Sequence, residues 1–300
     1  MPTTYRNRLW QRASARWAEI RAISADLLPA VALQQKLVTL MLDGADHLEQ
    51  PLPSGLSRAH VVEKWRRGLP ALRNEQVPIP DTLKDLLPAF AGAIADGGAG
   101  ESALHIRDAL LRGDIDAESL LGVSLARNRK AIRTSALHMG FSPDLIWLVG
   151  ELGSSPLAHH LQVQLVNGLE SHLGDWDRGY CPVCGSWPVL IESIDGSRQL
   201  RCSFCALAWA LRSHRCIYCG NAGEDFVAAA PDVNRGQRRV ELCAACASYT
   251  KVFEVSELTP FPLLAIEDLA SIDLDRGAME RRYARPELYD LDAIEPLKSC

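Results

Sequence analysis

The sequence lacks a long apolar run. Its longest apolar stretches, such as Leu37–Leu42 and Leu145–Gly150, are far shorter than the roughly 20 residues that a membrane-spanning helix needs. The arginine-bearing N-terminal residues 1–17 are not followed by the apolar core of a signal peptide and contain no adjacent arginine pair. We therefore expect a soluble, cytoplasmic protein without stable membrane insertion.

The sequence also lacks an excess of positive charge. Its formal net charge is −5, and the whole deficit lies in residues 256–300, where ten acidic side chains face five basic ones. Residues 1–174 and 175–255 are each balanced, with 18 and nine charges of either sign. Nucleic-acid-binding domains usually carry a basic surface, so this balance argues against that role.

Signatures of catalysis are missing as well. The chain contains no phosphate-binding loop, no nucleophile elbow and no helical zinc-protease motif. We therefore predict no catalytic residue and expect a protein that is not an enzyme.

What the chain has is a helical first part followed by short strand-like runs. Its 300 residues are 47% hydrophobic, which is enough to bury a sizeable core. Leu83, Leu87 and Phe90 belong to one of several apolar stripes at helical spacing before residue 174. The predicted fold class is α+β: a helical domain over 1–174, two tandem rubredoxin-like or zinc-ribbon-like β modules over 175–212 and 213–255, and an acidic, partly helical segment over 256–300.

Eight of the nine cysteines form four pairs with two residues between the members, and Cys300 is left over. A hairpin is predicted inside each module: one turns at Asp195-Gly196, and a looser one turns at residues 234–236 between strands at 226–230 and 239–242. Each cysteine pair is typical of a metal-binding turn, here called a knuckle. The order of knuckle, hairpin and knuckle thus occurs twice in the sequence. In a reducing compartment such cysteines indicate metal sites rather than disulfides.

Adjacent pairing of the knuckles gives gaps of 17 and 23 residues, each containing a hairpin that would bring its two pairs together. An interleaved, cross-braced pairing would break the repeat. Four sulfurs occupy every coordination position of a tetrahedrally bound ion and leave none for a substrate, so both sites are predicted to be structural or at most redox-active. Zinc and iron both accept this geometry, so the residues leave the metal open. The predicted ligands are Cys181, Cys184, Cys202 and Cys205 for the first site, and Cys216, Cys219, Cys243 and Cys246 for the second.

The four cysteine motifs, CPVCGS, LRCSFC, RCIYCG and ELCAAC, together with Tyr249-Thr250-Lys251 and the later IEDLASIDLD stretch, resemble those of FdhE-type formate dehydrogenase accessory proteins. The resemblance is specific from Tyr180 to about Asp275. It implies a cytoplasmic maturation factor for respiratory formate dehydrogenase. It further implies two iron ions, one per four-cysteine site, and association with the catalytic subunit before that subunit is exported.

Two other functions stay open at this point. The first is a rubredoxin-like electron carrier, which would show reversible one-electron reduction. The second is a zinc-ribbon nucleic-acid-binding protein, which would show steeply salt-dependent binding and which the charge balance disfavours.

Overall fold

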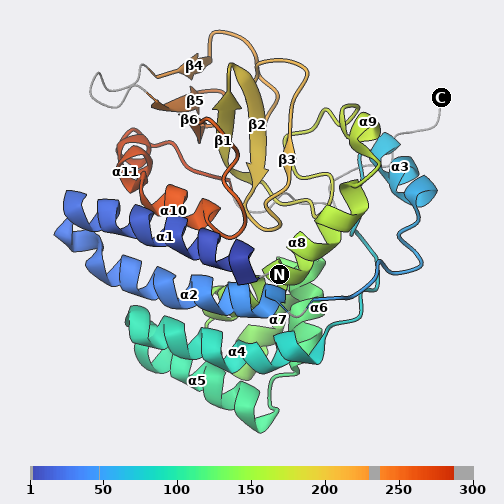
Figure 1. Ribbon diagram of the computed structural model, residues 1–300, viewed down its shortest axis with the longest axis vertical. Coiled ribbons are helices and arrows are strands. Elements are labelled where there is room, and N and C mark those ends of the chain that lie inside the picture. The colour runs from blue at the N-terminus through green and yellow to red at the C-terminus, as the bar shows by residue number, and fades with distance from the viewer. Residues whose placement is uncertain (1–2, 47, 230–236, 287–300) are drawn as a thin grey trace. The chain divides into compact units, whose positions relative to one another are not determined.

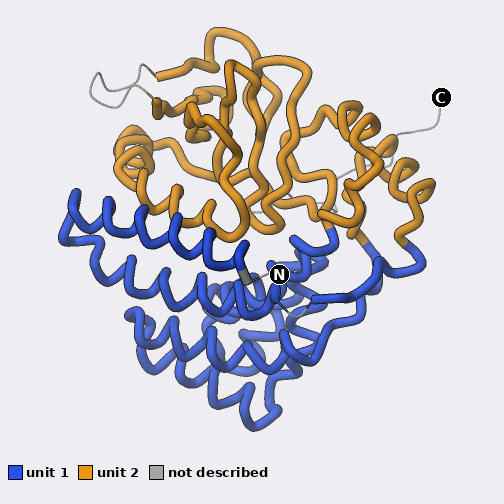
Figure 2. The backbone as a smooth tube through the Cα atoms, viewed as in Figure 1, with its two compact units in different colours: residues 1–55, 74–161 blue, residues 56–73, 162–300 orange. Residues whose placement is uncertain are grey.

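The computed structural model describes residues 3–46, 48–229 and 237–286. It has helices in its first part and a single mixed sheet in its second, so the predicted α+β class is confirmed (Figure 1). The chain forms two compact units, coloured separately in Figure 2. Unit 1 comprises residues 1–55 and 74–161, and unit 2 comprises residues 56–73 and 162–300.

Unit 1 is built from helices that bury one apolar side each. Trp17, Leu87 and Phe90 are fully buried at its centre, as their helical spacing predicts. The helices are α1 (Thr3–Ile23), the short η1 (Ala25–Leu27), α2 (Leu28–Asp46), α4 (Asp81–Ile94), η2 (Ala95–Ala99), α5 (Gly100–Arg112), α6 (Ala117–Leu125), α7 (Arg129–Met139) and α8 (Pro143–Val166), whose last turns belong to unit 2.

One helix differs from the sequence expectation. In the sequence, Gly153 favours two helices here, over residues 143–152 and 156–167, and Pro156 lacks the N–H that a helix interior uses. The structure has one helix, α8, with Pro156 inside it. Leu157, Ala158 and Leu161 are fully buried directly after the proline, and burial of this continuous apolar side outweighs the lost hydrogen bond.

The segment Ala25–Asp46 is long and apolar enough to cross a membrane, judged by length and composition alone. Its best window has a mean hydropathy of 1.2, and 22% of that window is buried. Core helices and signal sequences meet the same criterion. Here Val31, Val38 and Leu42 of α2 are buried in unit 1.

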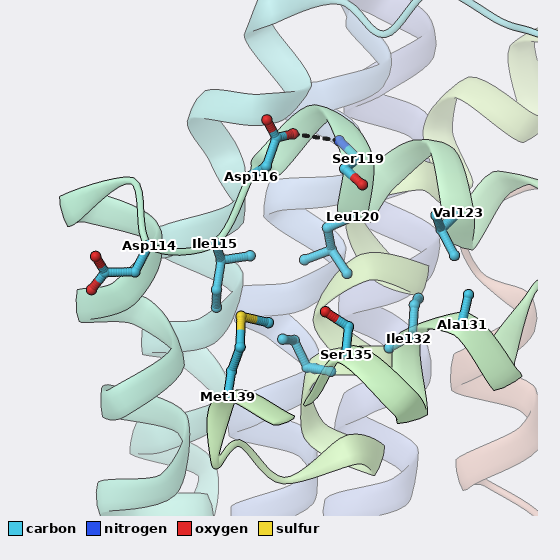
Figure 3. Close-up of a pocket in the computed structure, with 11 residues that line it drawn as sticks. Asp114, Ile115, Asp116, Ser119, Leu120, Val123, Ala131, Ile132, Ser135 and Met139 are labelled. Carbon is cyan, nitrogen blue, oxygen red and sulfur yellow. Dashed lines mark hydrogen bonds between the residues drawn. The ribbon is translucent and has the colours of Figure 1, made fainter. Parts of the chain in front are cut away.

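A cavity of about 350 Å³ opens between α6 and α7. Ile115, Leu120 and Ile132 line its apolar part (Figure 3). The two carboxylates at its edge are engaged locally: Asp116 accepts a hydrogen bond from the Ser119 N–H at the start of α6, and Asp114 pairs with Arg112. Both carboxylates are thus held by groups next to them in the chain.

Unit 2 contains a six-stranded sheet with the strand order β3-β2-β1-β6-β5-β4. Asp195 and Gly196, both with positive φ, make the predicted turn between the first two strands. The strands are β1 (Pro188–Ile194), β2 (Ser197–Cys202), β3 (Ala208–Trp209), β4 (Phe226–Ala228), β5 (Arg238–Cys243) and β6 (Ser248–Glu254); the helices are α3 (Arg58–Arg66), α9 (Glu170–Leu173), α10 (Leu264–Leu269) and α11 (Ile272–Glu280).

The sheet joins the two cysteine modules. β1–β3 belong to the first and β4–β6 to the second, and the seam is a parallel pairing of β1 with β6 that sets Ile191 opposite Val252. Both of these side chains are fully buried. The sequence predicts the two hairpins but not this seam. The expected turn at 234–236 and the end of the C-terminal segment, residues 287–300, lie outside the described residues.

Candidate metal centre

The first cluster is built from two tight knuckles. In the first knuckle the Gly185 N–H donates to the Cys181 carbonyl at 2.9 Å, and in the second the N–H groups of Phe204 and Cys205 lie 3.4 Å from the Cys202 sulfur. Gly185 has a φ of 86°, as expected for a residue that follows the second cysteine of a knuckle. Backbone N–H groups that point at sulfur stabilise its negative charge when the thiol is deprotonated.

The second cluster repeats this construction. The Gly220 N–H donates to the Cys216 carbonyl at 3.0 Å, and Gly220 has a φ of 78°. In both modules the residue after the second knuckle is an alanine, Ala206 or Ala247, and each adopts the same left-handed conformation, with φ of 60° and 52°. The shared backbone strain supports the sequence repeat as a structural repeat.

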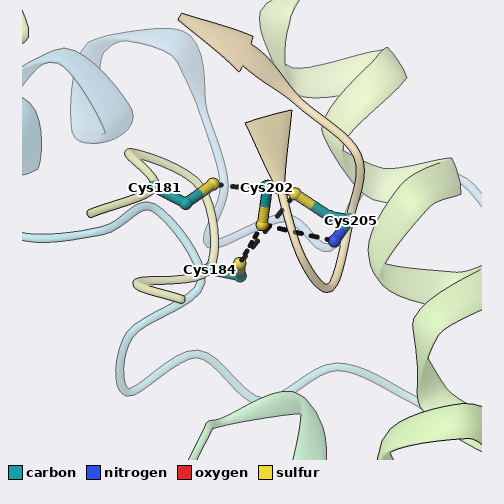
Figure 4. Close-up of side chains that lie close together, drawn as sticks. All are labelled: Cys181, Cys184, Cys202 and Cys205. Atoms are coloured by element: carbon teal, nitrogen blue, oxygen red, sulfur yellow. Dashed lines mark hydrogen bonds between the residues drawn. The ribbon is translucent and has the colours of Figure 1, made fainter. Parts of the chain in front are cut away.

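The structure groups the cysteines as adjacent pairing predicts. Cys181, Cys184, Cys202 and Cys205 converge from β2 and the flanking turns (Figure 4), and Cys216, Cys219, Cys243 and Cys246 converge in the same way. In each group the four sulfurs lie within 4.8 Å of one another, and all eight thiols are free of disulfides.

The spacing of the sulfurs fits a tetrahedral ion. The Cys181–Cys205 and Cys184–Cys202 sulfur distances in the first cluster are 3.6 and 3.4 Å. The Cys216–Cys246 and Cys219–Cys243 sulfur distances in the second cluster are both 3.6 Å. A tetrahedral ion with metal–sulfur bonds of about 2.3 Å sets its sulfurs about 3.8 Å apart. Each cluster could therefore hold one divalent ion with only small adjustments.

Two thiols of the first cluster favour their neutral form. Burial raises the pKa of the Cys181 and Cys205 thiols well above the usual value, and the Cys184 and Cys202 thiols beside them add to the rise. A buried thiol of this kind becomes a thiolate readily only when a nearby cation compensates its charge. A bound metal ion would supply that compensation.

In the second cluster, burial raises the pKa of the Cys216 and Cys246 thiols. Cys219 differs: burial again acts to raise its pKa, but the backbone of Asn221 and the neighbouring thiols outweigh that effect and lower it. The two clusters thus have the same ligands in different surroundings.

A segment from early in the chain supports the first cluster. Residues 56–73 of unit 2 include α3, and the Ala71 and Leu72 N–H groups donate to the carbonyls of Pro182 and Val183 at 2.8 and 2.9 Å. The Trp65 indole N–H also donates to the Pro182 carbonyl, at 2.8 Å. This contact spans more than 100 residues of sequence, and no local motif predicts it.

The knuckles of the two clusters also touch one another. A Cβ added to Gly179, two residues before Cys181, would lie 1.7 Å from the carbonyl oxygen of Ile217 inside the second module's first knuckle. Trp187 and Tyr218 meet edge to face with ring centroids 4.9 Å apart. Only glycine permits the first approach, so the two clusters form one packed structure.

A buried carboxylate bridges the modules. Glu241 on β5 is 2% exposed, and it accepts hydrogen bonds from Arg198 on β2, 2.8 Å from its Oε2, and from His214 between the modules at 3.1 Å. Burial acts to raise the pKa of Glu241, but Arg198 and then His214 outweigh it, so the pKa lies below its usual value.

This shift makes a pH-dependent prediction. A carboxylate whose folded-state pKa is lowered stabilises the fold above its unfolded pKa, and the contribution is lost as pH falls through the folded value. Glu241→Gln is therefore expected to cost about 1–3 kcal/mol near pH 7, with the difference from wild type shrinking below about pH 4.5. Urea unfolding of both proteins across this range measures it. A difference that stays constant down to acid pH would contradict the prediction.

Comparison with known proteins shows which sequences the chain resembles. No family model matches the chain. A protein FdhE homolog of Aquifex aeolicus is 32% identical over 117 residues, which are 37% of this chain and 41% of that protein. An FdhE homolog of Haemophilus influenzae is 32% identical over 148 residues, 48% and 44% of the two chains. Protein FdhE of Escherichia coli is 33% identical over 115 residues, 37% of each.

A solved structure is similar to this chain in fold. The crystal structure of the FdhE protein from Pseudomonas aeruginosa matches 93% of this chain and 95% of its own with a TM-score of 0.62 and 21% identity. The chain is thus similar to FdhE proteins. Its fold is similar to that of the Pseudomonas protein over nearly the whole length of both, whereas the sequence matches span less than half the length of each of the three relatives compared by sequence.

Proposed function

We propose that this FdhE-like protein is a cytoplasmic accessory protein for the maturation of respiratory formate dehydrogenase. It binds the catalytic subunit before that subunit is exported, and it is not itself an enzyme. The FdhE-like sequence and fold support the assignment. The observation that carries the non-enzymatic part is the closed nature of both clusters: four converging sulfurs leave an ion no open position for a substrate.

We further propose that the eight cysteines hold two iron ions, with zinc as the alternative. Four thiolates around one divalent ion carry a net charge of −2, so loading both sites adds about −4 to a metal region whose side chains are otherwise balanced. That charge, together with the absence of a basic excess, supports a protein partner rather than a nucleic acid.

The structure suggests how the cysteines serve this role. The ion would fix two knuckles against each hairpin, and the sheet would then present one rigid surface to the partner. The residues of this chain would supply the shape of that surface.

Deletion and complementation test the proposal. A host that lacks the protein is expected to make the formate dehydrogenase polypeptide but to show no formate oxidation in its membranes, and the wild-type gene should restore the activity. Cys181→Ser and Cys243→Ser are expected to fail in complementation. Normal formate oxidation in the deletion strain would refute the assignment, and full rescue by both variants would remove the metals from it.

A rubredoxin-like electron carrier is the second candidate, and the exposed Cys219 favours it, because a sulfur at the surface gives electrons a short path to a partner. The carrier would need iron in the second cluster. Reversible one-electron reduction that turns over rapidly with a donor would support this function, and a redox-inert protein would exclude it.

A further inference from the structure

We propose that the second cluster is an exchangeable metal site that opens at Cys219, whereas the first cluster holds its ion permanently. This inference rests on the proposed binding of one ion by each cluster. It assigns different tasks to two sites that the sequence presents as copies of one module.

The first observation is the difference in exposure. All four cysteines of the first cluster are buried, and Cys184 is the most exposed of them at only 4%. In the second cluster Cys216 and Cys243 are buried, Cys246 is partly exposed and Cys219 is exposed. Cys184 and Cys219 occupy equivalent positions in the repeat, so the same ligand is enclosed in one module and open to solvent in the other.

The second observation is what encloses the first cluster. The knuckle from Cys181 to Cys184 is held by the N–H groups of Ala71 and Leu72 and by the Trp65 indole, all on residues 56–73. Tyr180, next to this knuckle, donates its hydroxyl to the Gly68 carbonyl at 2.8 Å. To release its ion, this cluster must first break a set of buried hydrogen bonds.

The other knuckle of the first cluster is held as well. The buried Arg201 donates to the Ala206 carbonyl at 3.2 Å, directly after Cys205. The second module has a bond at the same position, since the Ala284 N–H donates to the Ala247 carbonyl at 2.9 Å, directly after Cys246. The difference lies in its first knuckle, where the contacts fall on Ile217, which packs on Gly179, and on Tyr218, whose hydroxyl donates to the Tyr249 carbonyl at 3.3 Å. They secure the middle of that knuckle and leave its last cysteine, Cys219, at the surface.

Ligand exchange at Cys219 needs no change in oxidation state. A small soluble thiol approaches the ion from solvent, its sulfur forms a bond to the ion, and the bond to the Cys219 sulfur breaks. The proton of the incoming thiol passes to the Cys219 sulfur, so charge and electrons balance. Repetition at Cys246, the second most exposed ligand, leaves the ion bonded to Cys216 and Cys243. A chelator then takes the ion by bonding to it as these last two bonds break, and each released sulfur accepts a proton from the chelator or from water. The same sequence in the first cluster is blocked because no sulfur is accessible.

Release kinetics of the zinc-loaded protein test the proposal. The full chain, reconstituted with two zinc ions, is mixed with a coloured zinc chelator and glutathione. We expect two phases of one ion each, with rates at least tenfold apart. Cys219→Ser should retain only the slow ion, and the matched Cys184→Ser only the fast one. Release of both ions in a single phase, or slow release from the Cys184 variant, would overturn the proposal.

Alkylation of the unaltered protein gives a second readout that does not depend on how the variants fold. With zinc bound, iodoacetamide should, among the eight cluster cysteines, modify Cys219 first and Cys181, Cys202 and Cys205 last, as peptide mass spectrometry can show. Modification that begins in the first cluster would overturn the proposal, and so would a reconstituted protein that retains fewer than two ions. Neither readout involves formate oxidation, so a failed deletion phenotype is distinguishable from a failed exchange site.

Discussion

Replacing Cys205 by serine is expected to remove one metal ion and to unfold the first module of the unit 2 sheet, β1–β3. Cys205 is fully buried in the first cluster, and apparent binding free energies of structural zinc in small domains are about 10–16 kcal/mol near neutral pH. Losing one of four ligands forfeits most of that energy, since a hydroxyl is a poor replacement for a thiolate. Because β1 pairs with both β2 and β6, the loss reaches the seam at β6, while the second cluster is expected to keep its own ion.

Metal analysis and circular dichroism check this expectation. The Cys205→Ser protein should carry one ion instead of two and lose part of its strand signal, while the helical signal of unit 1 persists. Cys246→Ser is the matched control in the other cluster, and it should also lose one ion but disturb β1 and β2 less. Retention of two ions by Cys205→Ser would show that this cysteine is not a ligand.

The second large effect is expected at a buried ion pair. Glu192 on β1 is fully buried, and its carboxylate accepts hydrogen bonds from Arg201 and, at 3.1 Å, from the backbone N–H of Thr259. Arg201 in turn donates to the Thr259 carbonyl at 2.6 Å. Burial lowers the pKa of Arg201, and Glu192 opposes that shift. Glu192→Ala would leave the guanidinium charge buried without its partner, which costs about 3–5 kcal/mol.

Two companion variants make this measurement specific. Glu254→Ala breaks the ion pair with Arg239, in which the Glu254 side chain is 38% exposed and the Arg239 side chain 25% exposed. Because this pair is close to solvent, its loss should lower the free energy of unfolding by no more than about 1 kcal/mol. The double variant Glu192→Leu with Arg201→Met replaces the buried charges by apolar groups and should recover much of the loss. Urea denaturation of the metal-loaded proteins gives all three values. Equal costs for Glu192→Ala and Glu254→Ala would show that burial does not govern the pair.

The features predicted from the sequence are those with a local cause. Two-residue spacing within each cysteine pair predicts a knuckle, and Asp195-Gly196 predicts the turn because both residues tolerate positive φ. Gaps of 17 and 23 residues, each containing a hairpin, then favour adjacent grouping, and the sulfurs are grouped in that way. Helical spacing likewise predicts which side of α4 is buried.

The features that escaped prediction depend on distant parts of the chain. Nothing in residues 56–73 indicates that their backbone caps the knuckle at Cys181, because plain N–H groups make the contact. The seam between β1 and β6 joins two apolar strands that could each have found another partner. The different exposure of Cys184 and Cys219 follows from these long-range contacts, so identical motifs have different surroundings.

The seam has a further consequence. Antiparallel neighbours give β1, β3, β4 and β6 one common direction, so the second module repeats the first by a shift along the sheet rather than by a two-fold rotation. The contact is heterologous: the first strand of one module meets the last strand of the other. Such head-to-tail contacts do not close on themselves and generate open arrays. A third module added after β6 could use the same contact, setting its last strand beside β4. What ends the array at two is the shortness of its outer strands, three residues in β4 and two in β3, which leaves little backbone for another chain to join.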